Sequence, residues 1–366
     1  MYKLAAIGLG HWFKRLYPGL SKNGNIAVVK AAAASPYESK AELLEKLGIS
    51  RKNYFVVASH SPMDENFFED VDVVYISDPN EFHAEQTLQA LSKGKIAVVE
   101  KTFGVNKAEF DSVVDYARKN KLEGKLYLHL HYLSKILAIE LPSLLDRFTS
   151  EYGKIAYTSA KFFEAENEED ARRSKWLFSM SNGSLFMDWV HPFELYYKGS
   201  MASDMKLNDV ELFVVNQKYD ATNPTGIHAM LTINGKYFAE NVKADVKIAK
   251  GLPKSLAEKS MIFRFDSGKS LVLNFVDSET EFVTDKRGSW KVIDQSGGVL
   301  LSGEPKGPNT SEKLASDIEL LCRGVGSGIS LDEANRIFDL QWKYQEMVKG
   351  KRLIAEEELV SKFIHQ

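Results

Sequence analysis

Short apolar runs alternate with amphipathic stretches along the first third of the chain. Six runs have the length of β-strands and are rich in Val, Ile, Ala and Leu: residues 3–10, 27–35, 55–58, 71–77, 96–99 and 126–131. Between them, apolar residues recur at helical spacing in residues 14–21, 39–47, 83–92 and 107–120. Continuously apolar strands that alternate with helices indicate a parallel sheet covered on both faces. We therefore predict an α/β domain with a parallel sheet over residues 1–125.

The pattern changes beyond residue 150, where stretches of strand length follow one another: residues 154–163, 210–216, 228–234, 236–246, 260–266, 269–277 and 281–284. Turn signals join several of them: Asn234-Gly235, Asp266-Ser267-Gly268 and Lys286-Arg287-Gly288. We predict an α+β domain with a predominantly antiparallel sheet over residues 126–310. One face of such a sheet can stay uncovered, which favours a homodimer or homotetramer formed through it.

Three further segments complete the predicted organisation. Residues 296–309 are rich in Gly, Pro and Ser, which predicts a loop. The acidic run at residues 164–170 is predicted to be a solvated loop. Residues 311–322 and 332–349 have helical periodicity, and we expect the C-terminal helices within residues 311–366 to pack back on the first domain.

Composition narrows the class of protein. The 366 residues are 44% hydrophobic and 27% charged, which is typical of a folded chain of about two domains. The net charge of −3 gives no general electrostatic reason to bind nucleic acid or a membrane surface. A single cysteine, Cys322, excludes an intrachain disulfide and a cysteine-rich metal site. No apolar stretch reaches the ~18 residues of a membrane span, so a soluble cytoplasmic protein is expected.

A glycine turn follows the first predicted strand. Gly8-Leu9-Gly10 stands where that strand meets the first helix. Glycines there permit a tight turn and a close approach of the backbone to a pyrophosphate, and the helix N-terminus supplies N–H donors. We expect a dinucleotide to be bound by Gly8, Gly10, His11, Trp12 and Phe13. Phe13 stands where a third glycine is usual, so a tight turn in another kind of α/β protein is the alternative.

The end of the second predicted strand bears on which dinucleotide is bound. An Asp or Glu there would accept hydrogen bonds from the adenosine ribose and repel a 2′-phosphate. The strand instead ends at Ser35, and Lys40 follows five residues later. A hydroxyl and an ammonium group suit a phosphate, so NADP is predicted, with NAD as the alternative through Glu38. In the structural alternative, Ser35 only caps a helix and Lys40 is solvated.

Three later segments carry a family resemblance. Asp78-Pro79-Asn80 with His83 follows the strand at 71–77, and Glu100-Lys101-Thr102 follows the strand at 96–99. Residues 182–191 read Asn-Gly-Ser-Leu-Phe-Met-Asp-Trp-Val-His. In this order, and with the glycine turn, they resemble the glucose–fructose oxidoreductase/inositol dehydrogenase family. The resemblance implies a Rossmann domain that binds NAD(P), with cofactor contacts from Asp78, Pro79, Asn80, His83, Glu100 and Lys101.

The same resemblance implies three catalytic residues. Oxidation of a sugar hydroxyl needs a base for its proton and a cation near the developing alkoxide. By resemblance, Lys101 contacts the nicotinamide and the reacting oxygen. His191 is the candidate base, and Asp188 either orients His191 or is itself the base. Two departures from the family pattern are the spacing of three residues between Asp188 and His191 and the replacement of proline by Thr102. An Asp at a helix N-terminus and a buried structural His are the alternative roles.

A second, local resemblance concerns the substrate. Residues 10–18, 100–104 and 131–135 are similar to segments of glucose-6-phosphate dehydrogenases, the last as His131-Tyr132-Leu133-Ser134-Lys135. It implies that His131 and Lys135 hold a sugar phosphate or another anionic group. Tyr132 and Trp176 are candidates to line the sugar site. His131 is alternatively a core residue, because His129 and His131 alternate with leucines at a strand end.

Together these features predict an NAD(P)-dependent oxidoreductase, with NADP favoured. It would transfer a hydride between the nicotinamide and a sugar, a sugar phosphate or a related polyol. An imine reductase acting on a biosynthetic intermediate is the alternative enzyme. A non-catalytic dinucleotide-binding sensor of the same fold is the alternative from another class, and it would be expected to lack the lysine, the acid or the base. No metal, nucleic acid or membrane partner is expected.

Overall fold

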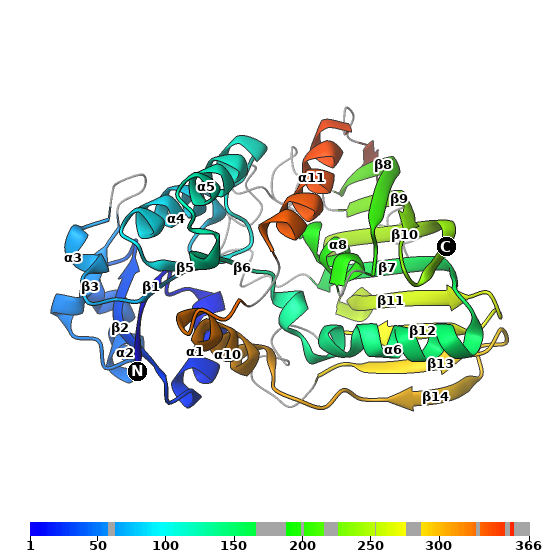
Figure 1. Cartoon of the computed structure of the whole chain (residues 1–366), viewed down its shortest axis with the longest axis horizontal. Coiled ribbons are helices and arrows are strands. Elements are labelled where there is room, and N and C mark those ends of the chain that lie inside the picture. The colour runs from blue at the N-terminus through cyan, green and yellow to red at the C-terminus, as the bar shows by residue number, and fades with distance from the viewer. Residues whose placement is uncertain are drawn as a thin grey trace. The chain divides into compact units, whose positions relative to one another are not determined.

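The chain forms two compact units, drawn in Figure 1. This computed structural model describes residues 1–57, 63–165, 188–198, 201–215, 226–252, 254–275, 287–326, 330–347 and 352–354. The first unit consists mainly of Met1–Ser134 and Pro308–Ala334. The second consists mainly of Lys135–Glu281, Asp285–Gly307 and Asn335–Gln366.

A six-stranded sheet forms the centre of the first unit. Its strands are β1 (Tyr2–Ile7), β2 (Ile26–Ala33), β3 (Tyr54–Val56), β4 (Val73–Ile76), β5 (Ile96–Glu100) and β6 (Leu126–His129). All pairs are parallel, in the order β3-β2-β1-β4-β5-β6. This confirms the predicted Rossmann-type domain. The chain changes direction across the sheet between β1 and β4, and open parallel sheets bind ligands beyond the strand ends at such a point.

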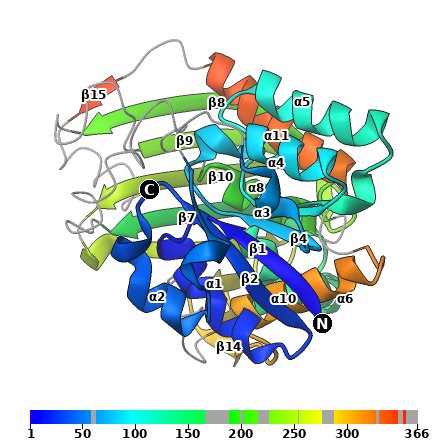
Figure 2. The same cartoon turned by 90° about the vertical axis from the view of Figure 1, so that its left-hand side faces the viewer.

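Helices cover this sheet because its strands are apolar on both faces; every residue of β4 is buried. The helices are α1 (His11–Lys22), α2 (Ala41–Lys46), α3 (Glu65–Phe68), α4 (His83–Ser92), α5 (Lys107–Lys119) and α10 (Thr310–Cys322). Although α10 comes late in the chain, it lies beside α1 (Figure 1, Figure 2). Leu16 and Leu314 share one core cluster, and a Cβ on Gly19 would lie 2.2 Å from the backbone of Ser311. The close approach of the two helices therefore depends on a glycine in α1.

A nine-stranded sheet forms the centre of the second unit. Its strands are β7 (Ile155–Ala165), β8 (Asp204–Val215), β9 (Gly226–Asn234), β10 (Phe238–Leu252), β11 (Glu258–Phe265), β12 (Ser270–Asn274), β13 (Ser289–Ile293), β14 (Val299–Gly303) and β15 (Arg352–Ile354). The order is β14-β13-β12-β11-β7-β10-β9-β8-β15. Among the described strands, only β7 with β10 and β8 with β15 pair in parallel. The predominantly antiparallel sheet predicted for the second domain is thus confirmed.

Helices α6 (Ile136–Tyr152) and α8 (Val190–Tyr197) cover one face of this sheet. The hydroxyl of Thr158 on β7 lies 3.0 Å from that of Tyr196 on α8. The ring of Phe148 on α6 meets Trp290 of β13 edge to face, with 5.6 Å between the ring centroids. Along β9, buried residues alternate with partly exposed ones, as expected of a strand with one covered face. Helix α11 (Leu331–Met347) follows α10 in the chain.

The structure corrects three predictions about elements, the first of which is the acidic loop, because its Glu164 belongs to β7. Residues 296–309, predicted as a loop, contain β14, which pairs with β13 at the edge of the sheet. Its Val299 and Leu300 stay 59% and 45% exposed, so the strand lacks the alternation by which a sequence reveals a half-buried strand. The helix predicted at 39–47 is shorter, because a 3-10 turn at Tyr37–Lys40 precedes α2. The strand predicted at 281–284 lies outside the described residues.

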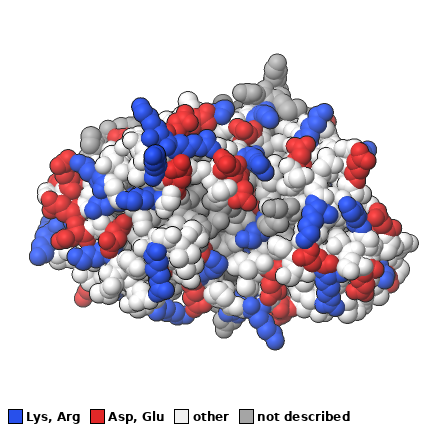
Figure 3. Space-filling model, viewed as in Figure 1, with Lys and Arg blue, Asp and Glu red and all other residues white. Residues whose placement is uncertain are grey.

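Basic and acidic side chains are interspersed on the face shown in Figure 3, as the near balance of 47 basic and 50 acidic residues predicts. In the described parts of the chain, no helix combines the length and the apolar character needed to cross a membrane.

Candidate functional site

The β1–α1 turn has the shape of a dinucleotide cradle. Gly8 has a φ of +84°, and a Cβ there would lie 2.4 Å from the backbone nitrogen of Asp78. The Ser77 hydroxyl fixes the turn by donating a hydrogen bond to the Gly8 carbonyl over 2.9 Å. Gly10 is the N-cap of α1, and a Cβ added to it would meet no atom within 4 Å. The turn therefore leaves open space at a helix N-terminus whose first turn holds no acidic residue.

The first residues of α1 differ in burial: Phe13 belongs to the core, whereas Trp12 is partly exposed. The Phe13 side chain is fully buried and packs toward Tyr75, with 6.4 Å between the ring centroids. Trp12 is half-buried, and its ring centroid lies 4.9 Å from that of His131. The guanidinium of Arg15 lies 5.2 Å from the Trp12 ring on the same helix. A predicted cofactor residue, Trp12, thus touches a predicted substrate residue, His131. His11 is the first residue of α1.

Two lysines lie near the end of β2. The pKa of Lys40 is lowered by its burial and, next, by the positive charge of Lys14. Ser35 follows the strand, and its carbonyl accepts a hydrogen bond from the Tyr54 hydroxyl over 2.5 Å. The nearest acid, Glu38, accepts a hydrogen bond from Arg51 and is thus already paired with a cation. The ammonium groups of Lys14 and Lys40 therefore repel each other, and an anion bound between them would reduce that repulsion.

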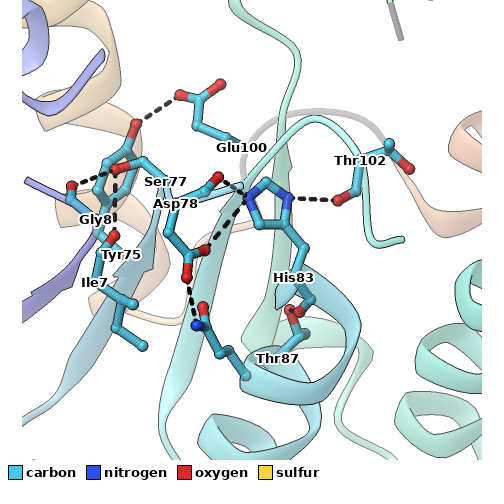
Figure 4. A network of polar contacts seen from close by, with 10 residues as sticks. Ile7, Gly8, Tyr75, Ser77, Asp78, His83, Thr87, Glu100 and Thr102 are labelled. Carbon is cyan, nitrogen blue, oxygen red and sulfur yellow. Dashed lines mark hydrogen bonds and ion pairs between the residues drawn. The ribbon is translucent and has the colours of Figure 1, made fainter. Parts of the chain in front are cut away.

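His83 ties together the loops that follow β4 and β5 (Figure 4). Its Nδ1 lies 2.7 Å from the carbonyl oxygen of Thr102, and its Nε2 lies 2.9 Å from that of Asp78. Both partners are acceptors, so a neutral ring donates to one of them and a protonated ring to both. The carboxylate of Asp78 accepts a hydrogen bond from Gln86 over 2.5 Å, and burial raises its pKa. Pro79 and Asn80 lie between them at the start of a 3-10 turn.

Glu100 is a buried anchor at the end of β5. Its Oε1 accepts hydrogen bonds from the Tyr75 hydroxyl and from Nδ1 of His129, each over 2.6 Å. Burial acts to raise the pKa of the Glu100 carboxyl, but the charge and hydrogen bond of His129, with that of Tyr75, outweigh burial and lower it. The half-buried Lys101 follows directly, and the peptide bond between Lys101 and Thr102 is cis. The contacts of Glu100 with Tyr75 and His129 therefore fix the end of β5, from which Lys101 follows.

Of the four predicted substrate residues, the structure describes His131, Tyr132 and Lys135. His131 and Tyr132 are buried in a 3-10 turn after β6, with 4.6 Å between their ring centroids. Lys135 is fully buried and is the N-cap of α6 in the second unit. Trp176 and residues 182–187 of the glycine-containing segment lie outside the described residues.

Asp188 and His191 lie together at the start of α8. Nε2 of His191 is 3.7 Å from Oδ1 of Asp188, and Nδ1 of His191 is 2.9 Å from Oε1 of Glu194. Lys250 on β10 forms an ion pair with Asp188. The motifs include neither Glu194 nor Lys250. Glu194 could have been identified from the sequence, because residues three apart on a helix lie on the same face and Glu194 follows His191 by three. No local sequence pattern links Asp188 to Lys250.

Further charges surround this pair in the second unit. Glu164, predicted in a solvated loop, is instead the last residue but one of β7 and lies 3.0 Å from Lys259 and 3.9 Å from Lys250. Burial acts to raise the pKa of Glu164, but the two lysines outweigh it and lower the pKa to about 2. Burial likewise acts to lower the pKa of Lys250, but Asp188 and Glu164 raise it. Lys101 belongs to the first unit, so its meeting with Asp188 and His191 stays a prediction.

Among the described residues, no group of three or more His, Cys, Asp or Glu side chains is arranged to hold a metal ion.

Comparisons with known proteins bear on this site. Residues 2–124 match the model of an oxidoreductase family with an NAD-binding Rossmann fold. KijD10, a 3-ketoreductase from Actinomadura kijaniata solved with NADP and TDP-benzene, is 17% identical at a TM-score of 0.72, over 97% of this chain and 99% of its own. An aldose-aldose oxidoreductase from Caulobacter crescentus, complexed with glycerol, is 16% identical at a TM-score of 0.72, over 94% of this chain and 96% of its own. No match is found among curated proteins.

The family match confirms the resemblance that the motifs of the first domain indicated, together with a nicotinamide dinucleotide as cofactor. At 16–17% identity, the likeness to the two solved structures shows the fold. The local resemblance to glucose-6-phosphate dehydrogenases stays a prediction.

Proposed function

We propose that this chain, whose residues 2–124 match the model of an oxidoreductase family with an NAD-binding Rossmann fold, transfers a hydride between NADP and a sugar, a sugar phosphate or a related polyol. The β1–α1 turn carries the proposal, because only glycine fits at Gly8 and the space above Gly10 is open. These are the two conditions under which a pyrophosphate can lie against backbone N–H groups at a helix N-terminus. The residues present therefore fit the cofactor.

The charges at the end of β2 support NADP over NAD. Lys14 and Lys40 are close enough for the charge of Lys14 to lower the pKa of Lys40, and a 2′-phosphate would relieve that repulsion. The ribose of NAD would meet Ser35 where an Asp or Glu usually stands. Glu38, the other candidate for the ribose, is engaged with Arg51.

In the proposed reaction, His191, Lys101 and Asp188 have separate roles. The nicotinamide supplies the hydride acceptor for oxidation and the hydride donor for reduction. In oxidation, His191 accepts the proton of the substrate hydroxyl, and the ammonium of Lys101 stabilises the developing alkoxide. In reduction, His191 returns the proton to the carbonyl oxygen. Asp188 keeps His191 in place.

Cofactor binding, substrate binding and association of copies of the chain would be distributed over the two domains. The first domain binds the cofactor, with Asp78, Pro79, Asn80, His83 and Glu100 shaping the loops around it. His131 and Lys135 are proposed to take an anionic group of the substrate, and Tyr132 its sugar ring. The face of the second sheet opposite α6 and α8 is proposed to join copies of the chain into a dimer or tetramer.

A substrate panel tests this proposal through the absorbance of the reduced nicotinamide, in both directions and with NADP and NAD. The panel holds free aldoses, polyols, sugar phosphates and sugars linked to nucleoside diphosphates. The last class is included because KijD10, which has a similar fold, was solved with TDP-benzene. We expect turnover of at least one class, faster with NADP. Tight NADPH binding without any turnover would favour the sensor, and turnover of an imine alone would favour the imine reductase.

A further inference from the structure

Glu194 and Lys250 flank the pair formed by Asp188 and His191. Glu194 lies one helical turn beyond His191 on α8, with its Oε1 2.9 Å from Nδ1 of His191. Lys250 comes from β10 and forms an ion pair with Oδ2 of Asp188. Nε2 of His191 faces Oδ1 of Asp188 at 3.7 Å, which is too long for a hydrogen bond. All four residues belong to the second unit.

We propose that Glu194 and Lys250 are positioning residues that make His191, and not Asp188, the base of the reaction. Glu194 accepts the proton of Nδ1, so that Nε2 of a neutral His191 carries the lone pair that accepts the substrate proton. Lys250 holds Asp188 as an ion-paired carboxylate. The inference rests on the proposed function, because it concerns the base of that reaction.

The contact between Glu194 and Nδ1 of His191 selects a tautomer of His191 when Glu194 is ionised. The side chain of Glu194 is fully buried, and an ionised carboxylate only accepts hydrogen bonds. Opposite an ionised Glu194, the ring nitrogen that faces it at 2.9 Å carries a hydrogen. In a neutral imidazole the other nitrogen is then the acceptor. A carboxylate orients the histidine of serine hydrolases in the same way, although the reaction there is different.

Charged side chains from several elements lie around Asp188 and His191. A series of contacts links His191 to ionisable side chains on several elements: Asp188 before α8 and Glu194 on α8 lie against His191, Lys250 on β10 pairs with Asp188, and Glu164 on β7 lies near Lys250 and Lys259 on β11. These are three carboxylates and two ammonium groups. Asp188 lies against Lys250, whose pKa is raised, and a carboxylate beside a lasting positive charge is a poor proton acceptor.

The two contacts predict opposite changes in the pH dependence of oxidation. Removing the Glu194 carboxylate takes a negative charge away from the imidazole, so the midpoint of the acid limb moves to lower pH. Removing the Lys250 ammonium leaves the charge of Asp188 uncompensated beside Nε2, so the midpoint moves to higher pH. A purely structural role for either residue would lower the rate without moving the midpoint.

The test uses the full chain with Glu194→Gln and Lys250→Met. Glu240→Gln, an exposed acid of the same unit, is the matched control. The rate of oxidation is measured against pH, and His191 is titrated by NMR in histidine-labelled protein, with its signal assigned by its loss in His191→Asn. We expect midpoints shifted by about one unit, down for Glu194→Gln and up for Lys250→Met, with kcat of Glu194→Gln reduced on the order of 100–10,000-fold. Glu194→Asp and Lys250→Arg keep each charge and should restore the midpoint.

Three results would overturn the inference: shifts in the same direction, unmoved midpoints, or a wild-type His191 with its proton on Nε2. The last readout needs no substrate and no variant other than His191→Asn, which assigns the signal. If the titrations shift as expected but the panel yields no turnover, the proposed function fails while the arrangement around His191 stands. If turnover is found but the midpoints do not move, the inference fails while the proposed function stands.

Discussion

At the scale of single residues, the two glycines of the β1–α1 turn meet different requirements. Gly8 has a positive φ, and any Cβ on it would collide with the backbone of Asp78. Gly10 has a φ of −80° and open space around it. A methyl group at Gly10 would therefore fit the protein and would intrude only on a ligand, whereas a methyl group at Gly8 would strain the turn itself.

Alanine substitutions should separate these two roles. Gly8→Ala should lower the free energy of unfolding by about 1–3 kcal/mol, because it forces a side chain into a left-handed conformation against backbone atoms. Gly10→Ala should change that free energy by less than about 1 kcal/mol and weaken NADPH binding. Urea unfolding and a fluorescence titration with NADPH measure the two effects. A Gly10→Ala variant that bound NADPH as tightly as the wild type would place the pyrophosphate elsewhere.

Ser35 should control the choice of cofactor. Ser35→Asp brings a carboxylate to the end of β2, where it would bind the ribose hydroxyls of NAD and repel a 2′-phosphate. We expect the ratio of the NAD to the NADP dissociation constants to fall, as measured by parallel titrations. Ser50→Asp adds the same charge at an exposed position and is the control. Wild-type protein that bound NAD more tightly than NADP would contradict the NADP assignment.

At the scale of elements, α10 illustrates how a distant helix is fixed on the first unit. Asn309 is its N-cap: Oδ1 of Asn309 accepts a hydrogen bond from the Glu312 backbone over 2.9 Å, and the Glu312 carboxylate accepts one from the Asn309 backbone over 3.2 Å. This reciprocal pair fixes the residue at which α10 begins. The same end of α10 packs against Gly19 of α1.

Loss of this cap should be measurable. Asn309→Ala should lower the free energy of unfolding by about 1 kcal/mol, because it leaves a backbone N–H at the helix start without its acceptor. Asn309→Ser retains a capping oxygen and should stay near the wild type. Urea unfolding of the two variants side by side checks the difference, and equal losses would show that the cap adds nothing to stability.

The elements also explain which predictions from the sequence succeed. The six strands of the first unit are apolar on both faces, so their runs stand out, and the motif loops that carry His83 and Lys101 directly follow them. β14 is missed because an exposed edge strand has no buried face to set a pattern. Lys250 is missed because its partner Asp188 lies on another element. The place of β10 in the sheet, beside β7, is likewise not predictable from either strand's own sequence.

At the scale of the whole molecule, paired carboxylates in both units tie stability to pH. The pKa of Glu100 in the first unit and that of Glu164 in the second are both lowered. A carboxyl whose pKa is lower in the folded chain binds protons more readily when unfolded. Its contribution is therefore complete above the unfolded pKa and is lost as the pH falls through the folded value.

For Glu164 this window runs from its ordinary pKa of 4.5 down to about 2. The wild type should lose stability as the pH falls through that range. Glu164→Gln should be less stable at neutral pH and should depend less on pH there. The free energy of unfolding in urea, measured at a series of pH values, checks this against Glu240→Gln. A Glu164→Gln profile parallel to the wild type would show that the pair with Lys259 does not contribute.

The central claim is that Lys101 acts on the reacting oxygen of a substrate beside a bound nicotinamide. Its most direct test compares NADPH affinity and substrate turnover in the wild type, in Lys101→Ala and in the exposed control Lys119→Ala. We predict that Lys101→Ala binds NADPH nearly as tightly as the wild type but turns over on the order of 100–1,000-fold more slowly, because the lysine acts mainly in the transition state. Retention of most of the activity by Lys101→Ala would contradict the account.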